Sequence, residues 1–378
     1  MKPEILFIST IHRMSERIIP VVKSLNKNFD IKILNTGQSS FNTKYEASLR
    51  YRKYLTSNFP KGTIFNTEKI SHKGESRGPK NCRDIFLAFE ALMTDNTAAV
   101  ILDDSRHKFF SQDLYRSAKK RGCKVFANTH GNISFKQIPL TYGLSHEKFY
   151  DHIFVFGDYE RDYMINLGCD KDFVLTGGIP ENDILSSAKK TNEYILVVPN
   201  FILQREVGGY QLDFCKNALA LNRDVIQKMK LPALQQKLGK KVFIKLKHRM
   251  SSPCDEEIET VRNIIPAGLE YDLVHHIDSE KDLISRASCV LTYGSTMSFK
   301  PIQLGIPTVI YKDLGYVGNF SAYPGVINVG DSYEYILKDE FINLEREKFL
   351  KRCLSGGVDF TSLNSYLASF YNNVGDTK

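Results

Sequence analysis

Short apolar runs recur along the chain and alternate with longer segments whose apolar residues return with the period of a helix. The runs are rich in Val, Ile and Phe, which is typical of parallel strands that are buried on both faces. In the first half, strands are predicted at residues 4–9, 29–34, 98–104, 124–129, 152–157 and 173–177, and helices at residues 17–27, 84–93, 112–122 and 158–168. Strand and helix in alternation predict a parallel, Rossmann-like sheet covered by helices.

A second series of the same kind follows a polar stretch at residues 186–193. Its predicted strands are residues 194–199, 241–247, 272–277, 289–293 and 308–312. A chain of 378 residues is also too long for one ordinary hydrophobic core. The sequence therefore predicts the α/β class, with two Rossmann-like domains facing across a cleft. We place the N-terminal domain at 1–188, the C-terminal domain at 189–360 and a last helix at 361–378, whose packing against the first domain stays open.

The turn Tyr293-Gly294-Ser295-Thr296 follows an apolar, β-branched run of the second series. Ligands of open parallel sheets bind at the carboxyl ends of strands, which is where this turn is expected. Gly294 would let the backbone approach a ligand closely, and Ser295, Thr296 and Ser298 offer hydroxyl groups at the start of a helix. The pattern favours a phosphorylated ligand, and the alternative is a simple helix cap.

His130 and two aspartates are the candidate catalytic residues of the first domain. His130 follows the predicted strand at 124–129 and precedes a glycine that leaves room for a ligand. An imidazole titrates near neutral pH and can take a proton from an acceptor hydroxyl. Asp103 and Asp104 end the strand at 98–104, where either could orient this base or hold an acceptor hydroxyl. A structural histidine and ordinary turn aspartates are the alternatives.

Basic residues end one predicted strand of the second domain. Lys245 and Lys247 share a face because side chains alternate, and His248 follows at the tip. Fixed cations there would balance the charge that grows on a departing diphosphate, so no metal ion is expected; the alternative is a solvated basic loop. Asn200, after the first strand of this domain, and Gly178, after the strand at 173–177, are further candidates for contact with a nucleotide or phosphate.

The composition limits the classes of binding partner but does not select one of them. The chain has 51 basic and 43 acidic residues, and its net charge of +8 favours nucleotide diphosphates, phospholipid surfaces or nucleic acid. Basic residues are dispersed and no basic motif has interleaved aromatic residues, so nucleic acid is the least supported of these partners.

The seven cysteines have neither the spacing of CxxC pairs nor that of a metal site, and they are expected to be reduced and mostly buried. No apolar run approaches ~18 residues, so we expect a cytoplasmic protein, with contact at the inner face of the membrane left open.

Several of these motifs occur in an order that resembles CDP-glycerol glycerophosphotransferase-like enzymes, which make teichoic-acid and capsule polymers. The motifs are the His130-Gly131 turn, the string from Gly178 to Asp183 and the basic strand end from Lys245 to Arg249. The resemblance implies the glycosyltransferase-B fold. In that family the histidine of the HG turn is the catalytic base, and the basic segment and the Ser/Thr turn hold the nucleotide diphosphate. The resemblance thus assigns those roles to His130 and to His248, Ser295 and Thr296.

Two differences from that family leave the donor open. Thr292-Tyr293-Gly294-Ser295 stands where the family has Asp-Tyr-Ser-Ser, and Asn200-Phe201 stands where it has Trp-Arg. The expected reaction is metal-independent transfer of a glycosyl or glycerophosphate group from a CMP, CDP or UDP donor. The expected acceptor is a cell-surface glycan or a lipid-linked glycan, as in capsule and lipopolysaccharide synthesis, and no further cofactor is expected.

The chain is also similar to the non-hydrolysing UDP-N-acetylglucosamine 2-epimerases, which share the fold. Those enzymes have an Asp-Ser-Gly-Gly turn and paired glutamates at the nucleotide site, whereas this chain has the sequence from Gly294 to Ser298 and no such glutamates. Their His-Glu-Ala-Gly turn is replaced by Thr129-His130-Gly131-Asn132. The epimerase is the alternative function, and a noncatalytic or nucleic-acid-binding protein on the same fold is a third hypothesis.

Overall fold

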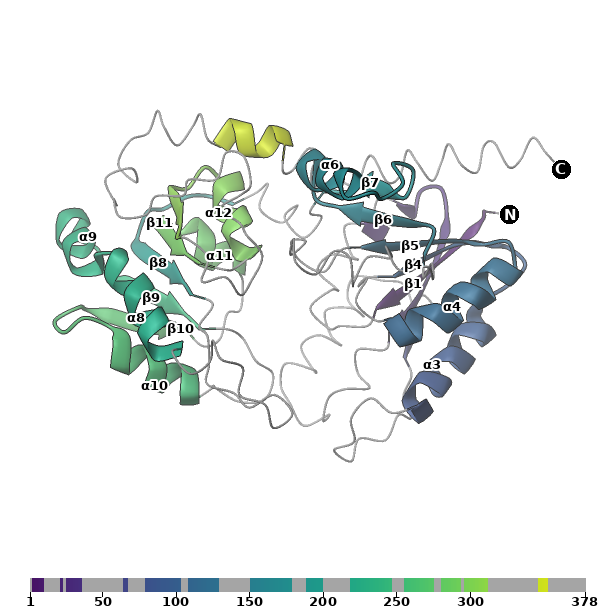
Figure 1. Ribbon diagram of the computed structural model, residues 1–378, viewed down its shortest axis with the longest axis horizontal. Helices are drawn as coiled ribbons and strands as arrows, with labels where there is room; N and C mark the ends of the chain where they lie inside the picture. Colours follow the sequence, from purple (N-terminus) through teal and green to yellow (C-terminus); the bar gives the residue numbers. More distant parts are fainter. Residues whose placement is uncertain are drawn as a thin grey trace. The chain divides into compact units, whose positions relative to one another are not determined.

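The computed structural model describes residues 2–9, 21–22, 25–35, 64–66, 79–102, 108–128, 150–178, 188–199, 218–246, 255–274, 280–293, 296–311 and 346–352. Contacts along the chain divide the protein into two units (Figure 1). The first comprises Met1–Asp183 and Arg352–Lys378, and the second comprises Ile184–Lys351. Each unit is built around a parallel sheet of its own.

The first unit contains, within its described residues, a sheet of seven strands in the order β3-β2-β1-β4-β5-β6-β7. Every printed pairing in it is parallel. The strands are β1 (Glu4–Ser9), β2 (Asp30–Asn35), β3 (Ile64–Asn66), β4 (Thr97–Leu102), β5 (Lys124–Asn128), β6 (His152–Val155) and β7 (Val174–Thr176). The chain runs outward from β1 in one direction and then restarts beside β1 with β4, which is the strand order of a Rossmann fold.

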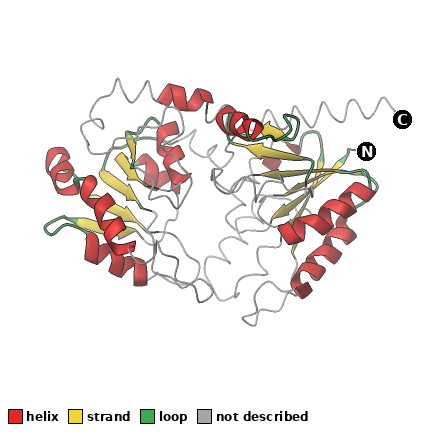
Figure 2. Ribbon diagram, in the orientation of Figure 1, coloured by secondary structure: helices red, strands yellow, loops and turns green. Residues whose placement is uncertain are grey.

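Buried apolar side chains cover this sheet on both faces, and Figure 2 shows the helices of this unit in red. The helices α3 (Pro79–Leu92), α4 (Lys108–Lys120) and α6 (Asp158–Asn166) pack apolar side chains on one face, where the core includes Phe89, Leu114 and Met164. On the other face, Val21 and Leu25 pack against alternate residues of the strands. Full burial of each such side chain stabilises the fold by ~1.5–3 kcal/mol relative to exposure.

The second unit repeats the design around a sheet with the order β10-β9-β8-β11-β12, counted over its described residues. Its strands are β8 (Tyr194–Val198), β9 (Val242–Lys245), β10 (Tyr271–Val274), β11 (Ala287–Thr292) and β12 (Thr308–Ile310), and again the printed pairings are parallel. One face packs against α8 (Ala218–Lys228), α9 (Leu231–Leu238) and α10 (Asp255–Ile264). The other packs against α11 (Glu280–Ser285) and the short helices η4 (Thr296–Ser298) and α12 (Phe299–Gln303). The predicted α/β class with two Rossmann-like units is confirmed.

Several element boundaries differ from the sequence prediction for physical reasons. The strand expected at 152–157 ends at Val155, because the Phe156 N–H donates to the Glu160 carboxylate (2.9 Å) instead of the sheet and α6 starts at Asp158. The helices α3 and α4 begin at Pro79 and Lys108, earlier than predicted. The short edge strand β3 was not predicted at all.

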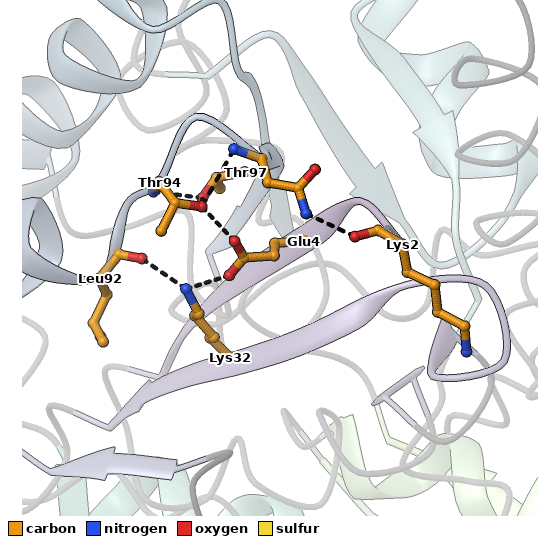
Figure 3. Close-up of polar contacts among 7 residues, drawn as sticks. Lys2, Glu4, Lys32, Leu92, Thr94 and Thr97 are labelled. Atoms are coloured by element: carbon orange, nitrogen blue, oxygen red, sulfur yellow. Dashed lines mark hydrogen bonds and ion pairs between the residues drawn. The ribbon is translucent and has the colours of Figure 1, made fainter. Parts of the chain in front are cut away.

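Polar contacts fasten the amino end of β1 (Figure 3). The Glu4 carboxylate pairs with Lys32 of β2 and accepts a hydrogen bond from the Thr94 hydroxyl, which precedes β4. Lys32 Nζ also donates to the Leu92 carbonyl at 3.2 Å, at the end of α3. One carboxylate therefore ties two neighbouring strands to the segment that leads into a third.

Cys123, Cys169 and Cys289 are free and buried, as the sequence predicted. Burial raises the pKa of the Cys289 thiol to about 12, so a thiolate nucleophile does not form there at neutral pH. Within the ranges that the structure describes, no helix is long and apolar enough to cross a bilayer.

Candidate functional site

The strand order of the second unit defines one place for a ligand. The chain moves outward from β8 to β9 and β10 and then restarts on the other side of β8 with β11. In open parallel sheets, ligands bind at the carboxyl ends of the two strands where the strand order reverses, which here are β8 and β11. The segment Tyr293-Gly294-Ser295-Thr296, where a turn is predicted, begins directly after the end of β11.

A hydrogen bond joins β8 and β11 at this position. The Thr292 hydroxyl donates to the Val198 carbonyl at 2.8 Å, and both residues are the last of their strands. The Thr292 carbonyl accepts from the Tyr311 N–H at 2.8 Å on the other side. Thr292 is fully buried, so these bonds hold the entry to the turn in a fixed position.

Lys245 ends β9, the strand next to β8. Its side chain alternates with the buried Ile244 and so lies on the sheet face of Val198 and Thr292. Lys245 is only 9% exposed and has an interaction partner, so it is not part of a solvated basic loop. A largely buried ammonium group beside these strand ends is suited to an anionic ligand, because a charge acts more strongly at low dielectric.

The turn continues into the 3-10 helix η4 and then into α12. Thr296 starts η4, and Ser298 is the N-cap residue of α12 but makes no capping hydrogen bond with its side chain. Ser298 is only 1% exposed, which puts its hydroxyl in the packed interior behind the turn. Gly294 and Ser295 lie outside the described residues.

A buried ion pair supports the helix that follows the turn. Lys300, the second residue of α12, pairs with the Glu280 carboxylate at the start of α11. The Lys300 side chain is 10% exposed and that of Glu280 is 32% exposed. A lysine in the first turn of a helix opposes the helix dipole, so the carboxylate compensates for an otherwise unfavourable charge.

Arg346 holds the other end of α12. Its guanidinium donates to the Gln303 carbonyl at 2.9 Å and, through Nε, to the Ile302 carbonyl at 3.2 Å. Gly305 ends this segment with a φ of +68°, and a Cβ there would lie 3.4 Å from Arg346 Nε. Both ends of the short helix behind the turn are therefore fixed by charged side chains.

The first unit brings together the two strands that lead to the candidate catalytic residues. β4 and β5 are neighbours, and their last registered pair joins Leu102 to Ala127. The sequence positions of Asp103 and Asp104 follow β4, and that of His130 follows β5. These three residues lie outside the described residues, as do Asn200, Lys247 and His248, so their roles stay predictions.

Gly178 has a local structural explanation. Its N–H and that of Gly177 both donate to the Val155 carbonyl, at 3.2 and 2.7 Å. Gly178 adopts a φ of +73°, and a Cβ on Gly177 would lie 2.8 Å from that of Phe154. The double glycine thus lets the chain turn tightly over β6, and the Gly178 N–H is already engaged. Contact of Gly178 with a phosphate stays a prediction.

Three residues of this region were not singled out from the sequence: Glu280, Lys300 and Arg346. Glu280 and Lys300 are 20 positions apart and Arg346 is more than 40 positions from the carbonyls that it binds. No local motif connects such residues. The one available signal is an isolated basic residue, Lys300, inside an otherwise apolar segment.

Comparisons with known proteins identify the fold. The sequence matches no protein-family model and no curated protein sequence. The structure is similar to UDP-GlcNAc 2-epimerase from Methanocaldococcus jannaschii (TM-score 0.63, 12% identity, 98% of this chain and 100% of that chain covered). It is also similar to UDP-GlcNAc 2-epimerase from Neisseria meningitidis bound to UDP-GlcNAc (0.62, 10%, 97% and 99%). A glycosyltransferase from Rickettsia africae is similar as well (0.56, 12%, 98% and 99%).

These similarities extend over nearly the whole chain, so both units share the architecture of those enzymes. The fold is that of the glycosyltransferase-B class, as the sequence predicted. At such low identities the comparisons establish the fold and not the reaction.

Proposed function

We propose that the protein is a nucleotide-sugar enzyme that transfers a glycosyl group from a UDP-type donor to a hydroxyl acceptor. The observation that carries the proposal is the carboxyl edge of the second sheet, where Lys245 is buried beside the Thr292–Val198 bridge at the reversal of strand order. That edge is the ligand position of open α/β sheets, and its positive charge suits a diphosphate. The structurally similar epimerases act on UDP-GlcNAc, which favours UDP among the donors considered.

In this proposal the second unit holds the nucleotide. Lys245, with Lys247 and His248 further along the chain, balances the negative charge that grows on the departing diphosphate. Gly294, Ser295 and Thr296 approach the phosphates through backbone and hydroxyl groups. The Glu280–Lys300 pair and the Arg346 contacts keep the helix behind this turn in place, so that the groups need little reorganisation.

The first unit supplies the acceptor side. His130 takes the proton from the acceptor hydroxyl, and Asp103 or Asp104 orients the imidazole or binds the acceptor. The adjacency of β4 and β5 favours this assignment, because residues that follow neighbouring parallel strands emerge at the same edge of a sheet. We propose a cell-surface or lipid-linked glycan as the acceptor, at the inner face of the membrane. The sequence resemblance suggests CDP-glycerol as an alternative donor, from which the enzyme would transfer glycerophosphate.

A second candidate function is epimerisation of UDP-N-acetylglucosamine. The similarity of the fold to two such epimerases over nearly the whole chain favours it. The residues behind the turn do not: Phe299 is buried in the core, and Lys300 is a cation paired with Glu280, where paired glutamates are expected of an epimerase. We therefore place transfer first.

Two measurements test the proposal in sequence. UDP, CDP, CMP, GDP and ADP are first compared by thermal shift, and UDP is expected to raise the melting temperature most, since a ligand of the folded state stabilises it. The protein is then incubated with UDP-GlcNAc and followed by NMR. Release of UDP only in the presence of a glycan acceptor supports transfer, whereas appearance of the C2 epimer without acceptor establishes the second candidate. Absence of any nucleotide shift would contradict both.

Matched variants test the residue roles. Lys245→Met should weaken UDP binding by ~10–100-fold, the equivalent of a lost charged hydrogen bond. Lys241→Met is the control, because Lys241 precedes the same strand at its opposite end and pairs with Asp272 at 2.9 Å.

His130→Ala should remove turnover and leave UDP binding nearly intact, with His152→Gln, at the amino end of β6, as its control. Equal loss of turnover and binding in His130→Ala would contradict the base role.

A further inference from the structure

Asn128 is a buried polar residue that the proposed mechanism does not yet use. It is the last residue of β5 and is only 7% exposed. Its side-chain oxygen is buried, and across the described part of the chain no hydrogen-bond donor contacts it. Asn128 is therefore an exception, because a buried acceptor normally has a partner.

The position of Asn128 in the sheet is well defined. Val125 and Ala127 belong to the core on one face of the sheet, and Phe126 belongs to the core on the other. Alternation puts the Asn128 carboxamide on the Phe126 face, one step further toward the carboxyl edge. Its registered neighbour on β6 is Phe154. The carboxamide thus follows an apolar, closely packed part of the sheet.

An apolar residue would be less costly at such a position. Val or Ile has a higher strand propensity than Asn and leaves no polar atom unsatisfied. Two hydroxyls at the ends of other strands do have partners: the Thr176 hydroxyl donates to Asp158 (3.1 Å) and the Thr292 hydroxyl donates to Val198 (2.8 Å). A ligand that donates a hydrogen bond would supply the partner that the Asn128 side-chain oxygen lacks.

The location selects the kind of ligand. Asn128 is at the carboxyl edge of the first sheet, beside the end of β4 and two positions before His130 in the sequence. We infer that the Asn128 carboxamide oxygen accepts a hydrogen bond from a sugar hydroxyl and is a specificity-determining residue of the first unit. A hydroxyl carries the proton that this oxygen lacks, whereas an ionised phosphate offers only acceptors. The inference rests on the proposed function, because it takes the ligand to be the glycan acceptor that the first unit binds.

The decisive variant is Asn128→Leu, which keeps the approximate shape and removes the polar atoms. The unfolding of the ligand-free protein in urea is measured first, and we expect the midpoint to stay the same or rise. The control is Asn222→Leu, because Asn222 is fully buried in α8 and has an interaction partner. We expect that control to lower the midpoint. A comparable drop in Asn128→Leu would overturn the inference, since the carboxamide would then have a structural partner.

Calorimetry with UDP and with a disaccharide of N-acetylglucosamine, the probe for the glycan acceptor, completes the test. Asn128→Leu should bind UDP like the wild type and the disaccharide about tenfold more weakly, which corresponds to about 1.4 kcal/mol. Unchanged affinity for the disaccharide, or an equal loss for both ligands, would overturn the inference. A wild type that binds the disaccharide but not UDP would contradict the proposed donor alone.

Discussion

The two edges of each parallel sheet differ in how their charged residues are used. At the amino edges, the charged groups pair with one another near the surface: Glu4 with Lys32, Asp151 with Lys119, Glu193 with Arg286, and Asp272 with Lys241. At the carboxyl edges, Asn128, Lys245 and Thr292 are buried among apolar side chains. The charged groups at the amino edges thus pair with one another near the surface, whereas these three polar residues at the carboxyl edges lie in the apolar interior.

This difference has a simple physical origin. Ligands of a parallel sheet gather where strands end and helices begin, so the opposite edge is free to be closed by ion pairs. Exposed pairs contribute little stability each, and a buried polar group is costly unless it is satisfied. Changes at the amino edge should therefore affect folding alone, and changes at the carboxyl edge should affect ligand binding.

The largest effect is expected from Glu280→Ala at the carboxyl edge. Loss of the ion pair between Glu280 and the largely buried Lys300 ammonium should cost roughly 2–4 kcal/mol of unfolding free energy. UDP affinity should fall too, because α12 supports the turn. Urea unfolding and calorimetry measure the two effects. The control is Glu193→Ala, which breaks an exposed pair with Arg286 and should change neither quantity measurably.

Asp151→Ala should come next, at the amino edge. The Asp151 carboxylate accepts from the Val125 N–H at 2.8 Å, the Lys119 ammonium at 3.1 Å and the Tyr115 hydroxyl at 3.3 Å. Its loss should lower the unfolding free energy by about 2 kcal/mol. The affinity for UDP should not change, and Asp151→Asn, which keeps an acceptor for Val125, should recover part of the stability. Weaker UDP binding in Asp151→Ala would contradict the expectation that changes at the amino edge affect folding alone.

Thr292→Val tests the bridge between β8 and β11. The variant keeps the β-branched shape and loses the hydrogen bond to Val198, so a loss of about 1 kcal/mol is expected in urea unfolding. A modest fall in UDP affinity should accompany it, since the entry to the turn is less well held. Thr292→Ser retains the hydroxyl and should preserve binding. A Val variant with wild-type affinity would show that the bridge serves folding alone.

The smallest effect is a pH dependence at His152, at the amino edge of the first sheet. Burial lowers the pKa of this histidine, although its Nδ1–H donates a hydrogen bond to the Asp172 carbonyl at 2.7 Å, which acts in the opposite direction. The unfolded state then binds more protons between the folded pKa and about 6.5, so stability should decrease as pH falls through that window. Melting temperatures at several pH values should reveal this dependence, and His152→Gln should reduce it. A histidine-dependent gain of stability at low pH would contradict this sign.

Much of the fold could be predicted from local pattern. The apolar runs that form β1, β5 and β8 were located to within about one residue, because a strand buried on both faces requires continuous apolar residues. The edge strand β3 was missed, since a short edge strand needs little hydrophobic character. The early start of α4 at Lys108 was missed too, because its first residues lack a capping signal.

Local pattern also indicated some residues of the candidate site and missed others. Lys245 and the residues after β11 could be selected as candidates because strand, glycine, basic and hydroxyl residues are adjacent in the sequence. Glu280, Lys300 and Arg346 were not, because their contacts join separate elements. Asn128 was placed in a predicted strand but not marked as a site, since nothing local distinguishes a satisfied amide from an unsatisfied one.

By itself, the sequence determined the α/β class, the two series of strands and the positions where polar residues follow them. These properties depend on the period and composition of neighbouring residues, which act over a few positions. Only the tertiary structure decided the order of strands in each sheet, which brings β8 beside β11 and β4 beside β5. It alone decided that Lys300 meets Glu280 and that the Asn128 oxygen is buried without a donor among the described residues, because burial and pairing depend on segments far apart along the chain.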